Sequence, residues 1–198
     1  MGLPPQGQVI YWRDGYKMDE MWMNLPEGGG TMESFHEAMM AYKKEMQQGT
    51  ILRAYRGLMA YLMALRTQFA ARYPDYVISG SLYMGFMDMS YFSFTPKALA
   101  ERKLKIAVVF LHETCRFEVW LAAANKQVQT RIWQQIKASG WTKYPLVAST
   151  QGADAVIEHI LVAEPDFSDL PALSGQIERG TLRFIQDVEE YLNLTKIC

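Results

Sequence analysis

Residues 80–94 read GSLYMGFMDMSYFSF, and residues 104–121 read LKIAVVFLHETCRFEVWL. In both stretches aromatic and branched side chains alternate with small or polar ones, a pattern typical of β-strands. The pattern predicts three extended runs, at 82–94, 104–111 and 116–122. A connector at 97–103 separates the first two runs, and a tight turn at His112–Thr114 separates the last two. We therefore expect an antiparallel meander at the centre of the fold.

The first of these runs contains Asp88 among apolar residues. Its even-numbered positions, from Leu82 to Phe94, share one face, and both faces are largely apolar. This favours a strand that is covered on both sides. A carboxylate enclosed there must be paired, hydrogen-bonded or protonated, because burying it alone is costly. We therefore expect Asp88 to be a buried site residue, unless a bulge turns it outward or it has the structural role of pairing with Arg53 or Arg56.

Helical periodicity predominates before and after the strands. Apolar residues recur every three or four positions, between capping residues, in the predicted helices at 31–49, 50–73, 125–138 and 169–192. Two further strands are predicted at 145–149 and 155–162. Strand runs flanked by helix runs predict an α+β fold in which helices pack on a largely antiparallel sheet, in the order ααβββαββα.

The chain of 198 residues suits one domain with a substantial core. Residues 1–30 are interrupted by Pro4, Pro5 and three consecutive glycines at 28–30, and no apolar period persists there. We therefore expect a loosely structured lead-in at 1–30. Residues 31–198 are expected to form a single α+β domain.

Composition and charge narrow the class of protein. The formal net charge is -1, which argues against a dedicated nucleic-acid binder. Cys115 and Cys198 have neither the spacing of a disulfide framework nor that of a metal site, which favours reduced thiols. Neither a signal peptide nor an apolar run long enough to span a membrane is recognisable. We expect a soluble cytoplasmic protein, bacterial in origin, with no membrane partner. The sequence leaves open which cofactor, if any, the protein uses, and it leaves a homo-oligomer open as well.

Polar and aromatic side chains gather on the third run. Arg116, Glu118 and Trp120 alternate with apolar residues and so share a face. His112 stands at the preceding turn, where an imidazole near a carboxylate could act as an acid or a base. The alternative is a solvated hairpin tip with a weak surface ion pair. The first functional hypothesis is a module that binds a small molecule or a protein partner on a polar-aromatic sheet face, formed by Asp88, His112, Arg116, Glu118 and Trp120.

The second hypothesis is a metal-dependent hydrolase or nuclease-like enzyme around Asp88. Such a site needs two carboxylates that hold Mg²⁺ and a lysine near the attacking water. Asp88, Glu101 and Lys103 supply these residue types, and Glu118 could replace Glu101. An acid followed two places later by lysine is a weak signal, because it occurs by chance in most chains of this length.

Several of these residues also support a family resemblance. The motifs LYMGFMDMSYF at 82–92, LKIA at 104–107, FEVWL at 117–121 and PDF at 165–167, together with Asn125, resemble an uncharacterised bacterial domain family of unknown function. The resemblance covers about residues 32–192, and it implies no catalytic residue because such a family has no assigned activity. A fainter similarity is to restriction-endonuclease-like domains. The chain departs from their pattern, since no proline precedes Asp88 and the E-x-K at 101–103 lies in the connector.

Overall fold

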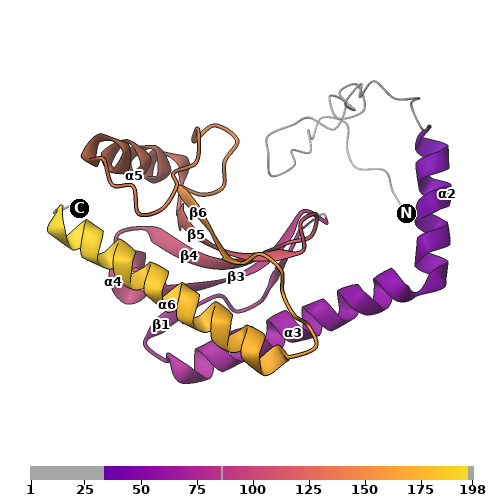
Figure 1. Ribbon diagram of the computed structural model, residues 1–198. Helices are drawn as coiled ribbons and strands as arrows, with labels where there is room; N and C mark the ends of the chain where they lie inside the picture. Colours follow the sequence, from indigo (N-terminus) through magenta and orange to yellow (C-terminus); the bar gives the residue numbers. More distant parts are fainter. Residues whose placement is uncertain (1–33, 86, 196–198) are drawn as a thin grey trace, which may run out of the picture. The chain divides into compact units, whose positions relative to one another are not determined.

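The computed structural model of the chain describes residues 34–85 and 87–195 (Figure 1). These residues belong to two units, one ending at Arg56 and the other beginning at Gly57. The predicted lead-in at 1–30 lies outside the described residues.

The first described element is helix α2 (Phe35–Gln48). Ser34 caps it: the Ser34 hydroxyl accepts a hydrogen bond from the Glu37 amide (3.2 Å), and the Glu37 carboxylate accepts one from the Ser34 amide (2.6 Å). This reciprocal pair is a capping box. Gly49 ends the helix with a φ of 76°, a conformation that glycine adopts without steric cost. The end predicted at residue 49 is confirmed, whereas the start predicted at residue 31 lies outside the described residues.

Helix α3 (Thr50–Arg72) follows at once and leads into the second unit. Its buried side chains recur at the spacing of one helix face: Met59, Tyr61, Leu62, Leu65 and Phe69. Phe69 lies against Phe92 and Phe94, with ring centroids 5.6 and 4.8 Å away in edge-to-face geometry. Aromatic pairs in this geometry add to the stabilisation that burial provides. The predicted bounds of this helix are confirmed to within a residue.

Among the described residues, six strands form one antiparallel sheet. They are β1 (Tyr76–Ile78), β2 (Tyr83–Met84), β3 (Met89–Pro96), β4 (Leu104–Leu111), β5 (Arg116–Ala123) and β6 (Ile157–Val162). Their order in the sheet is β1-β3-β4-β5-β6, and β2 also pairs with β3. The α+β fold class, with helices packed on an antiparallel sheet, is confirmed. Strand β1 is not predicted from the sequence, because its three residues are too few to show a period.

The strand predicted at 82–94 is interrupted, so the prediction of one continuous strand is wrong. Met87 has a φ of 66°, and the chain reverses between β2 and β3 to form a hairpin. The Gly85 amide donates to the Met89 carbonyl oxygen (2.9 Å). A Cβ at position 85 would lie 2.1 Å from Asp88 Oδ1, so this reversal requires glycine.

Alternation along the strands gives the sheet two faces. The face on which α3 packs, called the helix face, carries Phe92, Phe94, Val108, Phe110, Phe117 and Val119. The opposite face, called the second face, carries Met89, Tyr91, Ala107, Val109, Glu118 and Trp120. Met89, Ala107, Val109 and Trp120 form a buried apolar cluster there with Ala155. Side chains on both faces of the central strands are therefore buried.

Two of the connections from the sheet are helical. Helix α4 (Lys97–Glu101) joins β3 to β4, and helix α5 (Lys126–Ser139) follows β5. Asn125 caps α5, as predicted, because its Oδ1 accepts a hydrogen bond from the Val128 amide (2.9 Å). Lys103, between α4 and β4, has a φ of 60°, and its carbonyl oxygen accepts a hydrogen bond from the Ala124 amide (2.9 Å).

The region between α5 and the last helix contains less strand than predicted. Residues 145–149 form only an isolated bridge between Leu146 and Ile157, so the strand predicted there is wrong. Pro145 has no amide proton to donate to a neighbouring strand. The strand predicted at 155–162 is confirmed from Ile157 onward, as β6.

Helix α6 (Leu170–Leu194) begins at its predicted cap, where Asp169 Oδ1 accepts a hydrogen bond from the Ala172 amide (3.0 Å). A Cβ on Gly180 would come within 2.6 Å of Leu161 Cδ2. The missing side chain therefore lets the helix approach β6 closely. Neither α6 nor any other helix in the described part of the chain is long and apolar enough to cross a bilayer.

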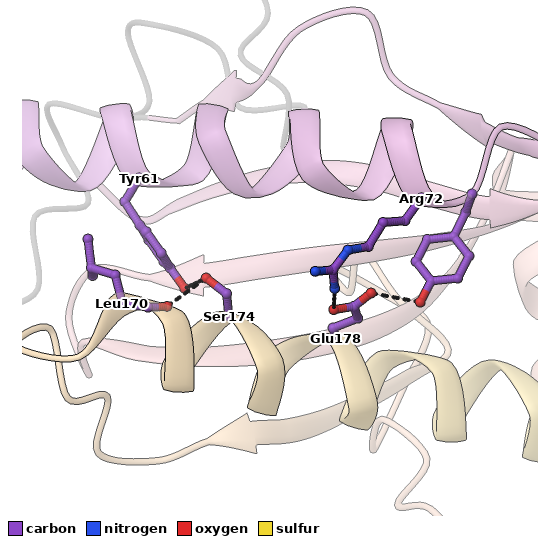
Figure 2. A network of polar contacts seen from close by, with 6 residues as sticks. Tyr61, Arg72, Leu170, Ser174 and Glu178 are labelled. Carbon is purple, nitrogen blue, oxygen red and sulfur yellow. Dashed lines mark hydrogen bonds and ion pairs between the residues drawn. The ribbon is translucent and has the colours of Figure 1, made fainter.

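Two polar clusters join α3 to α6, and Figure 2 shows both. In the first, the Ser174 hydroxyl donates to the Leu170 carbonyl oxygen (2.7 Å) and lies 3.1 Å from Tyr61 Oη. Because the single hydroxyl proton of Ser174 is already used, Tyr61 is the donor of the second bond. This cluster satisfies two buried hydroxyls within the helix pair.

The second cluster is centred on Glu178, a buried carboxylate of α6 (Figure 2). It pairs with the Arg72 guanidinium and accepts a hydrogen bond from the Tyr73 hydroxyl (2.7 Å). Burial, the bond to Glu178 and the negative charge of Glu178 together raise the pKa of Tyr73 to about 12. The carboxylate is thus compensated by a cation and a phenol at the end of α3.

We expect Phe69→Ala to lower the free energy of unfolding by about 3–5 kcal/mol, because it empties a fully buried site in the core. Met63→Ala is the control on the same helix, since Met63 is 59% exposed and its loss should change stability by less than about 0.5 kcal/mol. Urea unfolding followed by circular dichroism measures both. Equal effects of the two variants would contradict the packing of α3 on the helix face.

We also expect Tyr73 to make stability depend on pH in alkali. Folding raises the pKa of Tyr73 from 10 to about 12. The contribution of protonated Tyr73 to the free energy of unfolding is therefore complete below pH 10 and is lost as the pH rises through 12. In Tyr73→Phe this ionisation is absent. Urea unfolding should show wild-type stability falling relative to that of the variant across this interval, and parallel profiles would refute the Tyr73–Glu178 bond.

Candidate functional site

The structure places Asp88 in the reversal before β3, with its side chain exposed. Its Oδ1 accepts a hydrogen bond from the Met89 amide (2.7 Å), as aspartate does in turns. The prediction that Asp88 is buried in a strand is therefore wrong, because the chain turns at this point. Asp88 and Glu113 line a hollow of about 240 Å³, which is smaller than the roughly 300–1,000 Å³ typical of ligand sites.

His112 lies at the β4–β5 turn, as predicted, and its amide donates to the Asp88 carbonyl oxygen (3.0 Å). Its Nε2 lies 2.9 Å from Ser90 Oγ, a serine–histidine pair that the sequence analysis does not foresee. Burial lowers the pKa of His112, and the negative charge of Asp88 opposes that shift. Ser90 is only 1% exposed, with Oγ 3.9 Å from Met59 Sδ. The Ser90 hydroxyl is therefore enclosed, and a ligand-binding role for His112 stays a prediction.

Arg116, Glu118 and Trp120 meet on the second face. Glu118 Oε1 accepts a hydrogen bond from Arg116 Nε (2.7 Å) and forms an ion pair with Arg116 Nη2 (2.6 Å). Glu118 Oε2 accepts a hydrogen bond from Trp120 Nε1 (2.6 Å). Glu118 is 2% exposed. Charge-assisted bonds to both oxygens compensate its burial. A ligand-binding role for these three residues stays a prediction.

Glu158 on β6 joins this group and is not foreseen from the sequence. Its register partner on β5 is Trp120. Glu158 is exposed at its surface, but partial desolvation, with the negative charges of Glu118 and Asp154, raises its pKa, and the positive charge of Arg116 opposes the rise. The enclosed acid of the sheet is thus Glu118, and its charge influences a second acid on the neighbouring strand.

Two carboxylates of the metal hypothesis, Asp88 and Glu101, lie beyond opposite ends of β3. Asp88 directly precedes this strand, and Glu101 ends helix α4, which directly follows it. A strand of eight residues is about 26 Å long at 3.3 Å per residue. Glu118 is already bonded to Arg116 and Trp120. In residues 34–85 and 87–195, no group of three histidine, cysteine, aspartate or glutamate side chains is placed to hold a metal ion.

A larger hollow lies between α4 and α5, and we call it the basic hollow. It has a volume of about 610 Å³ and is lined by Ala98, Glu101, Arg102, Lys103, Gln127, Val128 and Arg131. Glu101 and Lys103 are predicted site residues, but for metal chemistry. Arg102 and Arg131 are not predicted, because nothing in the sequence indicates that the two segments meet.

The end of the β4–β5 pair fixes the two walls of the basic hollow. Leu104 is the register partner of Ala123, and the hydrogen bond from the Ala124 amide to the Lys103 carbonyl oxygen extends this pairing by one step. Lys103 therefore emerges beside the start of α5. Gln127 and Arg131 are four residues apart on α5 and so lie on one side of the helix.

Three cations and one carboxylate surround the basic hollow. Arg102 Nη2 donates to Asn193 Oδ1 (3.0 Å), whereas its Nη1 is buried without a hydrogen-bond partner. None of the ion pairs found within the described part of the chain involves Glu101, Lys103 or Arg131. The first turn of α5 contains no acidic residue, so no side chain of that turn offsets the partial positive charge of the helix N-terminus. The described lining carries more positive than negative charge, while the charge of Glu189 also acts on Arg102.

Comparison with known protein families connects the chain to one of them. Residues 35–192 match the family model of a domain of unknown function (DUF7000). The chain belongs to this family. The expected membership of an uncharacterised family is thus confirmed, while the fainter similarity to restriction-endonuclease-like domains stays a prediction. The comparisons with curated proteins and with solved structures found no match.

We expect Glu118→Gln to lower the free energy of unfolding of this DUF7000 domain by about 1–3 kcal/mol, because Arg116 loses its charged acceptor in a buried site. Asp88→Asn should change it by less than about 0.5 kcal/mol, because Asp88 is exposed and asparagine also accepts in turns. Urea unfolding of the two variants measures the difference. A larger loss for Asp88→Asn would reverse the assignment of the enclosed acid.

Proposed function

We propose that the chain binds a small ligand bearing a phosphate group, and that the basic hollow is the site. The observation that supports this is the convergence of Arg102, Lys103 and Arg131 on one hollow of about 610 Å³. This volume falls within the range of small-molecule sites. No acidic partner within the described residues neutralises Lys103 or Arg131.

The donors around the hollow suit a tetrahedral oxyanion. Guanidinium groups present paired N–H donors to phosphate oxygens, and a lysine ammonium adds a mobile point charge. The first amides of α5, at Lys126 and Gln127, have no partner within their own helix. Gln127 lines the hollow, which places the positive end of the helix dipole beside the same anion.

The chemistry of the lining favours binding over catalysis. The described residues of the lining include no histidine, cysteine or serine, so the imidazole base and the hydroxyl or thiol nucleophile of many hydrolytic sites are missing from this set. The sheet-face module is the second candidate. Its Glu118 oxygens are bonded to Arg116 and Trp120, so a ligand there would have to replace bonds that already exist.

We expect inorganic pyrophosphate, at constant ionic strength, to raise the Tm of the full chain, since a ligand that binds the native state stabilises it. Lys103→Gln combined with Arg131→Gln should weaken pyrophosphate binding by at least about tenfold, the equivalent of about 1.4 kcal/mol. Calorimetric titration checks the affinity.

The matched control is Lys43→Gln combined with Lys44→Gln, which removes the same charge from exposed positions on α2, outside the hollow. This control should bind pyrophosphate as the wild type does. Equal weakening in both double variants would show a general charge effect and refute the site. Binding of a long oligonucleotide without binding of pyrophosphate would also contradict a small-ligand site.

A further inference from the structure

We infer that the phosphate belongs to a hydroxyl-bearing organic molecule of the sugar-phosphate class, whose hydroxyl groups donate to Glu101. This inference rests on the proposed function and adds the class of ligand. It starts from Glu101, the acidic side chain among the described residues that line the basic hollow.

The Glu101 carboxylate does not suit a site that binds only a bare anion. Its carboxylate is exposed and makes no ion pair within the described part of the chain. A carboxylate close to a bound phosphate weakens the binding by repulsion between like charges. The same carboxylate becomes favourable when the ligand carries a hydrogen-bond donor beside its phosphate, because an ionised carboxylate is a strong acceptor.

The positive charges around the basic hollow determine which kind of hydrogen-bond donor the ligand can present to Glu101. An ammonium group on the ligand would be repelled by Arg102, Lys103 and Arg131, which line the same hollow. A hydroxyl group is a neutral donor and meets no such repulsion. Carboxylates bind ribose hydroxyls beside a phosphate-binding helix N-terminus in dinucleotide-binding folds for the same physical reason.

The volume of the basic hollow and its apolar lining residues fit a ligand that has an organic part as well as a phosphate. One water takes about 30 Å³ of liquid volume. On that scale a bare phosphate is small, so it would leave most of the hollow of about 610 Å³ unfilled. Ala98 and Val128 contribute apolar surface to the lining, and Val128 is 8% exposed. Apolar surface between polar groups suits the C–H face of a sugar ring.

The test compares ribose 5-phosphate with methyl phosphate, which has the phosphate monoester but no hydroxyl group. We expect the wild-type chain to bind ribose 5-phosphate about tenfold more tightly, since hydrogen bonds to charged groups are the stronger ones. Glu101→Gln should remove most of this preference. The same change should leave the binding of methyl phosphate unchanged or make it tighter, because a like charge is removed. Glu113→Gln is the control, an exposed acid outside the basic hollow.

The outcomes separate the ligand class from the site itself. If Glu101→Gln strengthens both ligands equally, or if the wild type prefers neither, the ligand class is wrong and the phosphate site stands. If the wild type binds none of ribose 5-phosphate, methyl phosphate and pyrophosphate, both the proposed function and the inferred ligand class are wrong. Loss of the preference in Glu113→Gln as well would show a surface-charge effect and overturn the role of Glu101.

Discussion

The register between β4 and β5 is the constraint on which the other features depend. It runs from Leu104 opposite Ala123 to Leu111 opposite Arg116. At the turn end it directs Arg116 and Glu118 to the second face, and at the other end it brings α4 beside α5. A slip of one residue would turn the Glu118 side chain toward the aromatic core of the helix face. An unpaired carboxylate there would cost several kcal/mol, so this register is strongly specified.

The helices and the two central strands could be predicted because their burial follows the period of each element. Helices α3 and α6 each bury one stripe, and β4 is an almost continuous apolar run. The β2–β3 hairpin could not be recognised in this way. Tyr83 pairs with Tyr91 and Met84 with Ser90, so paired positions are both odd or both even. A hairpin and a continuous strand therefore give the same alternation, and only Gly85 marks the difference.

The candidate site could be predicted only in part. The positions of Arg116, Glu118 and Trp120 follow from alternation along one strand, but alternation does not show that Glu118 is the enclosed acid. The basic hollow needs two segments that are distant in sequence. Glu101 and Lys103 stand out in the sequence as a pair suited to metal chemistry, whereas Arg131, which α5 brings beside them, gives the group its positive character.

Gly180 has a consequence for how the sequences of this family can vary. The helix comes so close to β6 that a side chain at 180 and the leucine at 161 exclude each other in the observed conformation. A homologue with alanine or serine at 180 must therefore have another rotamer of the leucine at 161, a smaller or differently branched residue there, or a wider spacing between helix and sheet. Correlated substitution at these two positions would record this contact in an alignment, without any measurement on the protein itself.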